Sequence, residues 1–213
     1  MSHEEPASEQ ILKETKLVSL ALFAALIAVF GLVPRIDLPF LAGVPITLQT
    51  LGVMLAGVFL RPSQAVLAVG LFLLVVLLGA PFLSGGRGGI GVLFGPGAGF
   101  LLGWLLGAWV TSFVFRFVCK RTNNRATGSE VGATAEEGTR THPRLMLACF
   151  VACLVGGIAT IYSVGIPWLA WRSNIDLFAA AVVSMGFLPG DLLKATLASW
   201  VVTKLHPQVM RSL

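Results

Sequence analysis

Apolar residues in this chain gather in long stretches that contain no Asp, Glu, Lys or Arg. Such uncharged stretches cover residues 17–34, 65–86, 88–115 and 145–171. A helix that crosses a lipid bilayer needs about 20 predominantly apolar residues. Apolar and polar residues do not alternate with a period of two, as they would in the strands of a membrane β-barrel. The pattern therefore predicts an all-α integral membrane protein.

Breaks in the apolar pattern divide the chain into six predicted transmembrane helices. A shorter helix is expected near Asp176–Ser184. Pro189 suits the start of the last helix, because the N–H that proline lacks would have no partner there. We predict one membrane domain over residues 16–206, which includes a polar connector at 120–143, with a flexible leader at 1–15 and a tail at 207–213. The expected transmembrane helices are Lys16–Val33, Pro45–Leu60, Gln64–Leu78, Gly97–Cys119, Arg144–Val164 and Pro189–Leu205.

The composition supports this class. Of the 213 residues, 56% are hydrophobic and only 12% are charged, whereas a soluble domain carries about a quarter charged residues. The first apolar stretch follows a polar leader and no small-residue cleavage site closes it, so we expect a retained helix rather than a signal peptide. The net charge of +5 does not indicate nucleic-acid binding, because the basic residues flank the apolar stretches as topology signals do.

The basic residues also predict the orientation of the helices. Six spans place both termini on one side, together with the turn at 61–63 and the connector at 120–143. The opposite side receives only Arg35, Arg87 and Arg172. Because Lys and Arg are enriched in cytoplasmic loops, we expect both termini in the cytoplasm. The basic side carries Lys13, Lys16, Arg61, Lys120, Arg121, Arg125, Arg140, Arg144, Lys204 and Arg211.

Three loops expected on the external side are themselves apolar, namely Pro34–Val44, Gly79–Pro96 and Gly165–Leu188. Irregular backbone at membrane depth is tolerated where it packs within protein or lines a water-filled cavity. We therefore expect these loops to fold back over a cavity near the external face.

Asp191 and Lys194 are two opposite charges in the last apolar segment. A charge in mid-membrane costs about 2.5–3.5 kcal/mol even on the mildest scale. Residues three apart share one helix face and can neutralise each other, and a carboxylate in the first turn is stabilised by unpaired backbone N–H groups. The pair fits either of two roles: a helix cap with a structural ion pair, or a polar pocket that binds a polar ligand.

Uncharged polar residues and small residues mark two further helices. Thr47, Gln49 and Thr50 stand at the start of the second predicted helix, where they can bond a ligand or neighbouring backbone. Gly95, Gly99, Gly103 and Gly107 recur every four residues, which favours close helix packing. On the first helix, Ala21 pairs with Ala25 and Ala24 pairs with Ala28, and these small residues suit contact with another helix, within the chain or in a partner.

Other chemistry has little support in the sequence. Cys119, Cys149 and Cys153 are expected to be buried small hydrophobic residues, and the three histidines lie in termini or a polar loop, so no metal site is predicted. The glycines at 85–91 lack the G-x-x-x-x-G-K-[ST] pattern of a nucleotide-binding loop. An Asp–Lys pair can do acid–base work, but no catalytic pair accompanies it, so we do not predict an enzyme.

Four stretches together resemble the BioY family, whose members are the biotin-binding S components of energy-coupling-factor transporters. They read VPITLQTLGVMLAG (44–57), GGIGVLFGPGAGFLLG (88–103), GIPWLA (165–170) and PGDLLKA (189–195). The resemblance implies the six-helix S-component fold, a biotin pocket near the external face and a location in the cell membrane of a prokaryote. It also implies a transmembrane coupling protein and two ATPase subunits as partners, besides membrane lipid, and no cofactor other than biotin as the transported ligand.

The resemblance assigns roles to particular residues. The P-G-D-x-x-K motif of the family falls on Asp191 and Lys194, and the substrate-binding candidates are Asp191, Lys194, Thr47, Gln49, Arg87 and Trp168. The partner-interface candidates are Ala21, Ala24, Ala25 and Ala28. Arg87 and Phe100 depart from the residues expected in the glycine-rich stretch. An S component for another small vitamin and an intramembrane enzyme remain as alternatives, which binding of radiolabelled biotin without turnover would separate.

Overall fold

The computed structural model describes residues 7–34, 36–37, 45–126 and 137–205, and nearly all of them are helical. Two strands of two residues each, β1 and β2, pair antiparallel between the first two helices. The elements in chain order are α1 (Ala7–Leu32), β1 (Ile36–Asp37), β2 (Pro45–Ile46), α2 (Gln49–Phe59), α3 (Pro62–Leu77), η2 (Ile90–Phe94), α4 (Ala98–Ala126), α5 (Glu137–Ala152), η3 (Cys153–Thr160), α6 (Ile161–Ser173), α7 (Leu177–Met185) and α8 (Leu188–Lys204).

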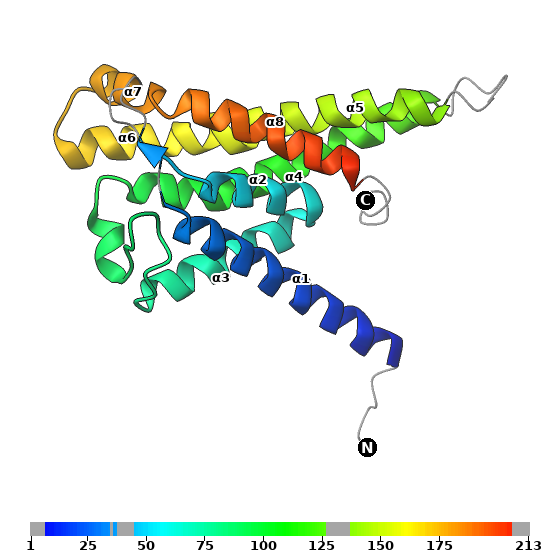
Figure 1. Ribbon diagram of the computed structural model, residues 1–213, viewed down its shortest axis with the longest axis horizontal. Helices are drawn as coiled ribbons and strands as arrows, with labels where there is room; N and C mark the ends of the chain where they lie inside the picture. The colour runs from blue at the N-terminus through cyan, green and yellow to red at the C-terminus, as the bar shows by residue number, and fades with distance from the viewer. Residues whose placement is uncertain (1–6, 35, 38–44, 127–136, 206–213) are drawn as a thin grey trace.

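Helix α4 is the central element of the bundle. It packs against α2, α3, α5, η3 and α6, and the long helices run roughly side by side (Figure 1). Helix α1 crosses the bundle obliquely, and its N-terminal half extends away from the other helices. A core of buried side chains, with Phe72, Phe115, Ile27 and Met54 among the largest, joins these elements.

The described helices match the predicted membrane class. Three of them are long and apolar enough to cross a membrane: Lys13–Leu32, Ala98–Arg121 and Arg144–Ser173. The pair α7 and α8, bent by 51°, makes a fourth candidate span, and α2 and α3 are shorter apolar helices. Counted together, these segments correspond to the six predicted ones. Large apolar side chains cover the outside of the bundle, such as Leu78 at 80% exposure and Leu67 at 59%, as expected where lipid is the solvent.

The segment from α5 through η3 to α6 forms one helix, and its predicted end at Val164 is wrong. The helix continues through Pro167 to Ser173 and ends at Asn174, which adopts a left-handed conformation with φ of 52°. Proline removes one backbone hydrogen bond, but neighbouring helices compensate for this loss in membrane proteins. As a result, Trp168 and Arg172 project from a rigid helix instead of an irregular loop.

Other boundaries also differ from the prediction. Helix α1 begins at Ala7, so residues 7–15, which were assigned to a flexible leader, are helical; the Glu and Lys residues there are good helix formers. Helices α4 and α5 likewise extend into the expected connector, to Ala126 and from Glu137. Residues 127–136, together with residues 1–6, most of the loop at 34–44 and the tail, lie outside the described residues. The short helix α7 appears where it was expected.

Glycines let α4 approach η3 and α6 closely. A Cβ atom at Gly107 would lie 2.7 Å from Ile161 Cγ1 and 2.8 Å from the carbonyl oxygen of Gly156. A Cβ atom at Gly103 would lie 3.0 Å from the Ile161 carbonyl oxygen. The predicted packing face of glycines is therefore confirmed at these positions, and it fixes the position of α6 against the bundle.

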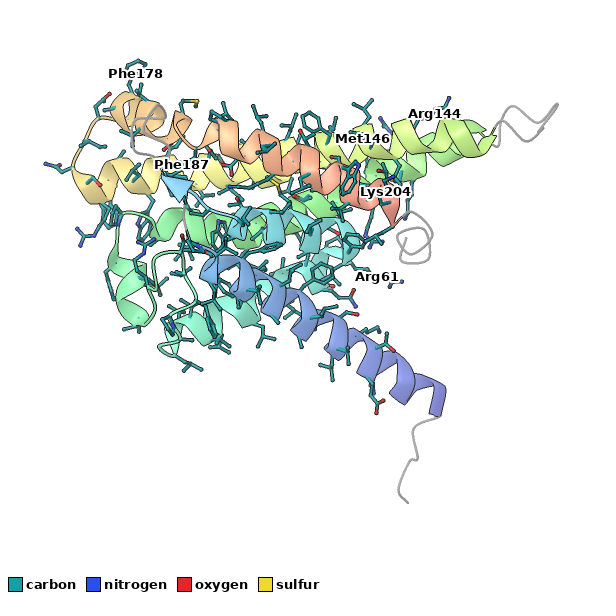
Figure 2. The ribbon with its side chains drawn as sticks, viewed as in Figure 1. Arg61, Arg144, Met146, Phe178, Phe187 and Lys204 are labelled. Atoms are coloured by element: carbon teal, nitrogen blue, oxygen red, sulfur yellow. The ribbon has the colours of Figure 1, made fainter. Side chains whose placement is uncertain are left out.

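The labelled side chains distinguish two ends of the bundle, a basic end and an aromatic end. Arg61, Arg144 and Lys204 lie toward one end of the bundle, whereas Phe178 and Phe187 lie toward the other (Figure 2). The first turns of α1 and the last turn of α8 lie toward the basic end as well (Figure 1).

Candidate functional site

A buried ion pair between Asp191 and Lys194 is the centre of the candidate site. Both residues lie in α8, Asp191 in its first turn. Lys194 Nζ lies 2.8 Å from Asp191 Oδ1, and each side chain is only 6% exposed. The i,i+3 spacing brings the two groups to one helix face. Because the pair is neutral as a whole, burying it costs less than burying either charge alone.

Thr50 ties the ion pair to the start of α2. Its hydroxyl accepts a hydrogen bond from Lys194 Nζ at 2.9 Å and donates one to Asp191 Oδ1 at 3.1 Å. One hydroxyl thus satisfies both charges at once, which suits a hydroxyl because it is both donor and acceptor. The sequence placed Thr50 among the polar residues of α2 but did not pair it with α8.

Tyr162 completes the cluster from α6. Its hydroxyl donates a hydrogen bond of 2.7 Å to Asp191 Oδ2, and its ring packs edge-on against Phe100 at 6.0 Å between centroids. Phe100 also contacts Phe187. Tyr162 was not among the residues predicted for the site. A signal was available, because it is the one tyrosine in the chain, it lies in an uncharged stretch, and a buried tyrosine hydroxyl usually needs a partner.

The π-helical segment η3 contributes to the direction of Tyr162. It spans Cys153–Thr160 and ends two residues before Tyr162. A π-helix makes i→i+5 hydrogen bonds and therefore has wider turns than an α-helix. Eight residues of it rotate the following helix relative to an uninterrupted α-helix. The segment thus sets the helical phase in which Tyr162 faces Asp191.

The hydrogen bonds leave capacity for a ligand. Lys194 has three N–H donors, and its described bonds to Thr50 and Asp191 use two of them. Asp191 Oδ2 accepts one bond, from Tyr162, and a carboxylate oxygen can accept two. The cluster can therefore offer one donor and one acceptor to a bound molecule, beside the apolar rings of Phe100 and Phe187.

Gln49 holds a segment that we call the α3–α4 strap, residues 79–97. Its Nε2 donates to the carbonyl oxygen of Phe82 at 3.0 Å, and its Oε1 accepts from the backbone N–H of Ser84 at 2.9 Å. Gln49 is 2% exposed. Its amide therefore bonds the backbone, which was one of the two roles that the sequence left open.

The other predicted substrate-binding residues lie around the strap. Trp168 is half-buried, and its Nε1 donates to the carbonyl oxygen of Gly95 at 3.1 Å. Arg87 is exposed and bonds the carbonyl oxygen of Ser84 within the strap. Thr47 was expected on a helix, but it lies between β2 and α2, because α2 begins only at Gln49. Of the six candidates, the structure brings only Asp191 and Lys194 directly together.

The four alanines of α1 point in different directions. Ala24 is buried at 8% exposure, and Ala28 packs against the core, whereas Ala21 and Ala25 are exposed. The face with Ala21 and Ala25 is thus the one that is open to a partner. Among the described residues, no group of His, Cys, Asp and Glu side chains has the arrangement of a metal site.

Apolar helices with lipid-facing leucines, built around a neutralised and hydrogen-bonded ion pair, define a helical membrane protein with a polar site in its interior. Intramembrane charges of this kind mark substrate or ion sites. Comparison with known proteins gives the particular family. The model of the BioY family matches residues 4–211, and the chain belongs to this family.

Named relatives extend over nearly the whole chain. It is 42% identical over 195 residues to a probable biotin transporter BioY of Bacillus subtilis, covering 92% of each chain. It is also 42% identical to a biotin transporter BioY of Rhizobium etli, covering 86% of this chain and 88% of the relative. The fold is similar to the crystal structure of the S-component for biotin from an ECF-type ABC transporter, with a TM-score of 0.72, 30% identity and 95% coverage of both chains. The relatives are named as transporters, which agrees with the prediction that the chain is not an enzyme.

Proposed function

We propose that this protein is the biotin-binding S component of an energy-coupling-factor transporter and that biotin binds at the Asp191–Lys194 cluster. The single observation that carries the proposal is this buried ion pair, held by Thr50 and Tyr162, in a chain of the BioY family. The names of the relatives and of the similar structure support biotin as the ligand.

The cluster suits the chemistry of biotin. Biotin has an apolar bicycle, a ureido group with two N–H donors and one carbonyl acceptor, and a carboxylate at the end of an aliphatic chain. The remaining N–H of Lys194 can donate to a ligand oxygen, and Asp191 Oδ2 can accept a ureido N–H. The rings of Phe100 and Phe187 provide apolar surface for the bicycle, as in ligand sites that combine apolar walls with a few placed polar groups.

Either the carboxylate or the ureido oxygen of biotin can accept the hydrogen bond from Lys194. Biotin methyl ester lacks the carboxylate charge but keeps the ureido group, and 2-iminobiotin changes the ureido oxygen but keeps the carboxylate. If Lys194 binds the carboxylate, Lys194→Met should weaken biotin binding strongly and leave binding of the methyl ester nearly unchanged. If Lys194 binds the ureido group, the substitution should weaken binding of both biotin and its methyl ester.

Uptake against a gradient requires a source of energy. Its sequence contains no G-x-x-x-x-G-K-[ST] loop for a nucleotide. We therefore propose that a transmembrane coupling protein and two ATPase subunits drive delivery, and that the exposed alanines of α1 meet the coupling protein. The basic end of the bundle with Arg61, Arg144 and Lys204 (Figure 2) supports a cytoplasmic position for that end, with both termini, in a prokaryotic cell membrane.

Equilibrium binding of radiolabelled biotin to the purified protein tests the ligand. We expect saturable binding at one site per chain and recovery of unchanged biotin, since an enzyme would modify it. Asp191→Asn should weaken binding at least tenfold, because the uncharged amide no longer balances Lys194 and has one oxygen instead of two. Asp176→Asn is the matched control, because Asp176 is an exposed cap of α7 and should leave affinity unchanged. Equal affinity of parent and Asp191→Asn would return the pair to a purely structural role.

A further inference from the structure

The α3–α4 strap is anchored to α2 and α6, the two helices besides α8 whose side chains bond Asp191. At one side, Gln49 of α2 bonds the strap backbone, and its neighbour in the sequence is Thr50. At the other side, Trp168 and Arg172 of α6 bond the carbonyl oxygens of Gly95 and Phe94. Helix α6 also carries Tyr162. The strap therefore joins the two helices whose side chains complete the polar cluster.

The contact at Gln49 includes a third helix. A Cβ atom at Gly31 of α1 would overlap the carbonyl oxygen of Phe82 and would lie 2.6 Å from Gln49 Nε2. The strap backbone thus rests directly on α1 at the point where Gln49 bonds it. Leu83, between the two bonded residues, is 4% exposed. This point of contact is closely packed, and small shifts of α1, α2 or the strap would disturb its hydrogen bonds.

We propose that Gln49 is a positioning residue that latches the strap, and that opening of this latch sets the rates at which ligand enters and leaves the Asp191–Lys194 cluster. The proposal rests on the proposed function, because it takes biotin as the ligand. Gln49 acts through the strap backbone, whereas Thr50, one residue later, acts on the ion pair. Two adjacent residues of α2 thereby link the state of the strap to the state of the site.

The geometry explains why glutamine suits this position. The side-chain amide carries a donor and an acceptor at one end, and both are used on successive parts of one chain segment, at Phe82 and Ser84. Methionine has a similar length but lacks the amide, so it can fill the space without these two hydrogen bonds. A buried donor and acceptor on the strap would then lose their partner, which favours the open strap.

The rate of biotin release from Gln49→Met tests the latch. Protein in lipid nanodiscs is loaded with radiolabelled biotin, chased with excess unlabelled biotin and filtered at intervals. We expect release at least about tenfold faster than from the parent, the change expected from loss of two ordinary hydrogen bonds. Gln64→Met is the matched control, because Gln64 also bonds backbone, at Arg61, but on α3 away from the strap; it should release biotin at the parental rate.

Two readouts separate a latch from a general loss of stability. A misfolded fraction lowers the amount of biotin bound at saturation but does not change the release rate of the remainder. Amide hydrogen exchange without ligand should also rise in peptides that cover residues 79–89 of Gln49→Met and stay unchanged in peptides from α8. An unchanged release rate in folded Gln49→Met would overturn the proposal.

The parent protein and Gly31→Ala keep the proposal testable if Gln49→Met does not fold. In the parent, bound biotin should slow hydrogen exchange in the strap at 79–89, and unchanged exchange would contradict a latch that controls access to the site. Gly31→Ala should speed release, because its methyl group displaces the strap at Phe82. A parent that fails to bind biotin would instead refute the proposed function, and strap exchange in Gln49→Met would still show whether Gln49 holds the strap.

Discussion

The Tyr162 hydroxyl of α6 donates a hydrogen bond of 2.7 Å to Oδ2 of Asp191 in α8, a residue 29 positions further along the chain. Thr50 and Lys194 bond the other carboxylate oxygen, Oδ1. The carboxylate is thus held on both oxygens and from three helices. Such fixed groups bind a ligand without a large ordering cost at the moment of binding, so this network should affect affinity even where its members do not touch the ligand.

Removal of the tyrosine hydroxyl should weaken biotin binding. In Tyr162→Phe the ring still packs against Phe100, but Asp191 Oδ2 loses its described donor. A hydrogen bond to a charged group contributes about 1.5–3 kcal/mol, so we expect affinity to fall about tenfold in equilibrium titrations. Thr160→Val is a suitable control, because the Thr160 hydroxyl bonds only a carbonyl of its own helix in the described structure. Full affinity in Tyr162→Phe would mean that the bond orients nothing that biotin requires.

Trp168 should act on the strap and not on the ligand. Trp168→Phe keeps an aromatic ring but removes the Nε1 donor to the Gly95 carbonyl. We expect faster hydrogen exchange in peptides covering residues 90–97 and an affinity for biotin within about threefold of the parent, since the second anchor at Arg172 remains. Trp171→Phe, at a position 73% exposed, should change neither quantity. A large loss of affinity together with unchanged exchange would favour direct contact between Trp168 and biotin.

The close approach of α4 to η3 should make Gly107 intolerant of a side chain. Gly107→Ala places a methyl group within 3 Å of the Gly156 carbonyl oxygen and Ile161, and overpacking of this kind costs about 1–3 kcal/mol. We expect the midpoint of thermal unfolding in detergent to fall by several degrees. Gly97→Ala provides the comparison, because no atom lies within 4 Å of a Cβ atom there. Equal midpoints for the two variants would show that the helices separate at little cost.

The exposed alanines of α1 should serve a partner and not biotin. Replacement of Ala21 and Ala25 by Leu adds bulk on the outer face of α1, where lipid can accommodate it, but a closely packed partner helix cannot. We expect near-normal biotin binding, reduced co-purification with the coupling protein and loss of ATP-driven uptake. Ala24→Leu provides the contrast, because Ala24 is buried and should lower the stability of the isolated protein. Normal assembly of the double Leu variant would place the coupling interface elsewhere.

The sequence by itself determined the class of protein and the pairing of Asp191 with Lys194. The uncharged stretches are long enough for membrane helices. Residues at i and i+3 share one face of a helix, so the pairing depends only on local geometry. The glycine face of α4 could also be predicted from the sequence, because residues four apart lie on the same side of a helix. The resemblance to the BioY family, carried by short motifs, was confirmed over most of the chain.

Only the tertiary structure decided which residues meet across helices. Thr50 lies 141 residues from Asp191, and Tyr162 reaches the same carboxylate because η3 changes the helical phase just before it. Such contacts depend on how helices pack and rotate, which no local pattern encodes. For the same reason the sequence did not show that Gln49 bonds the backbone of the strap or that Pro167 lies inside a helix. The neighbouring helices supply the packing that makes each of these arrangements stable.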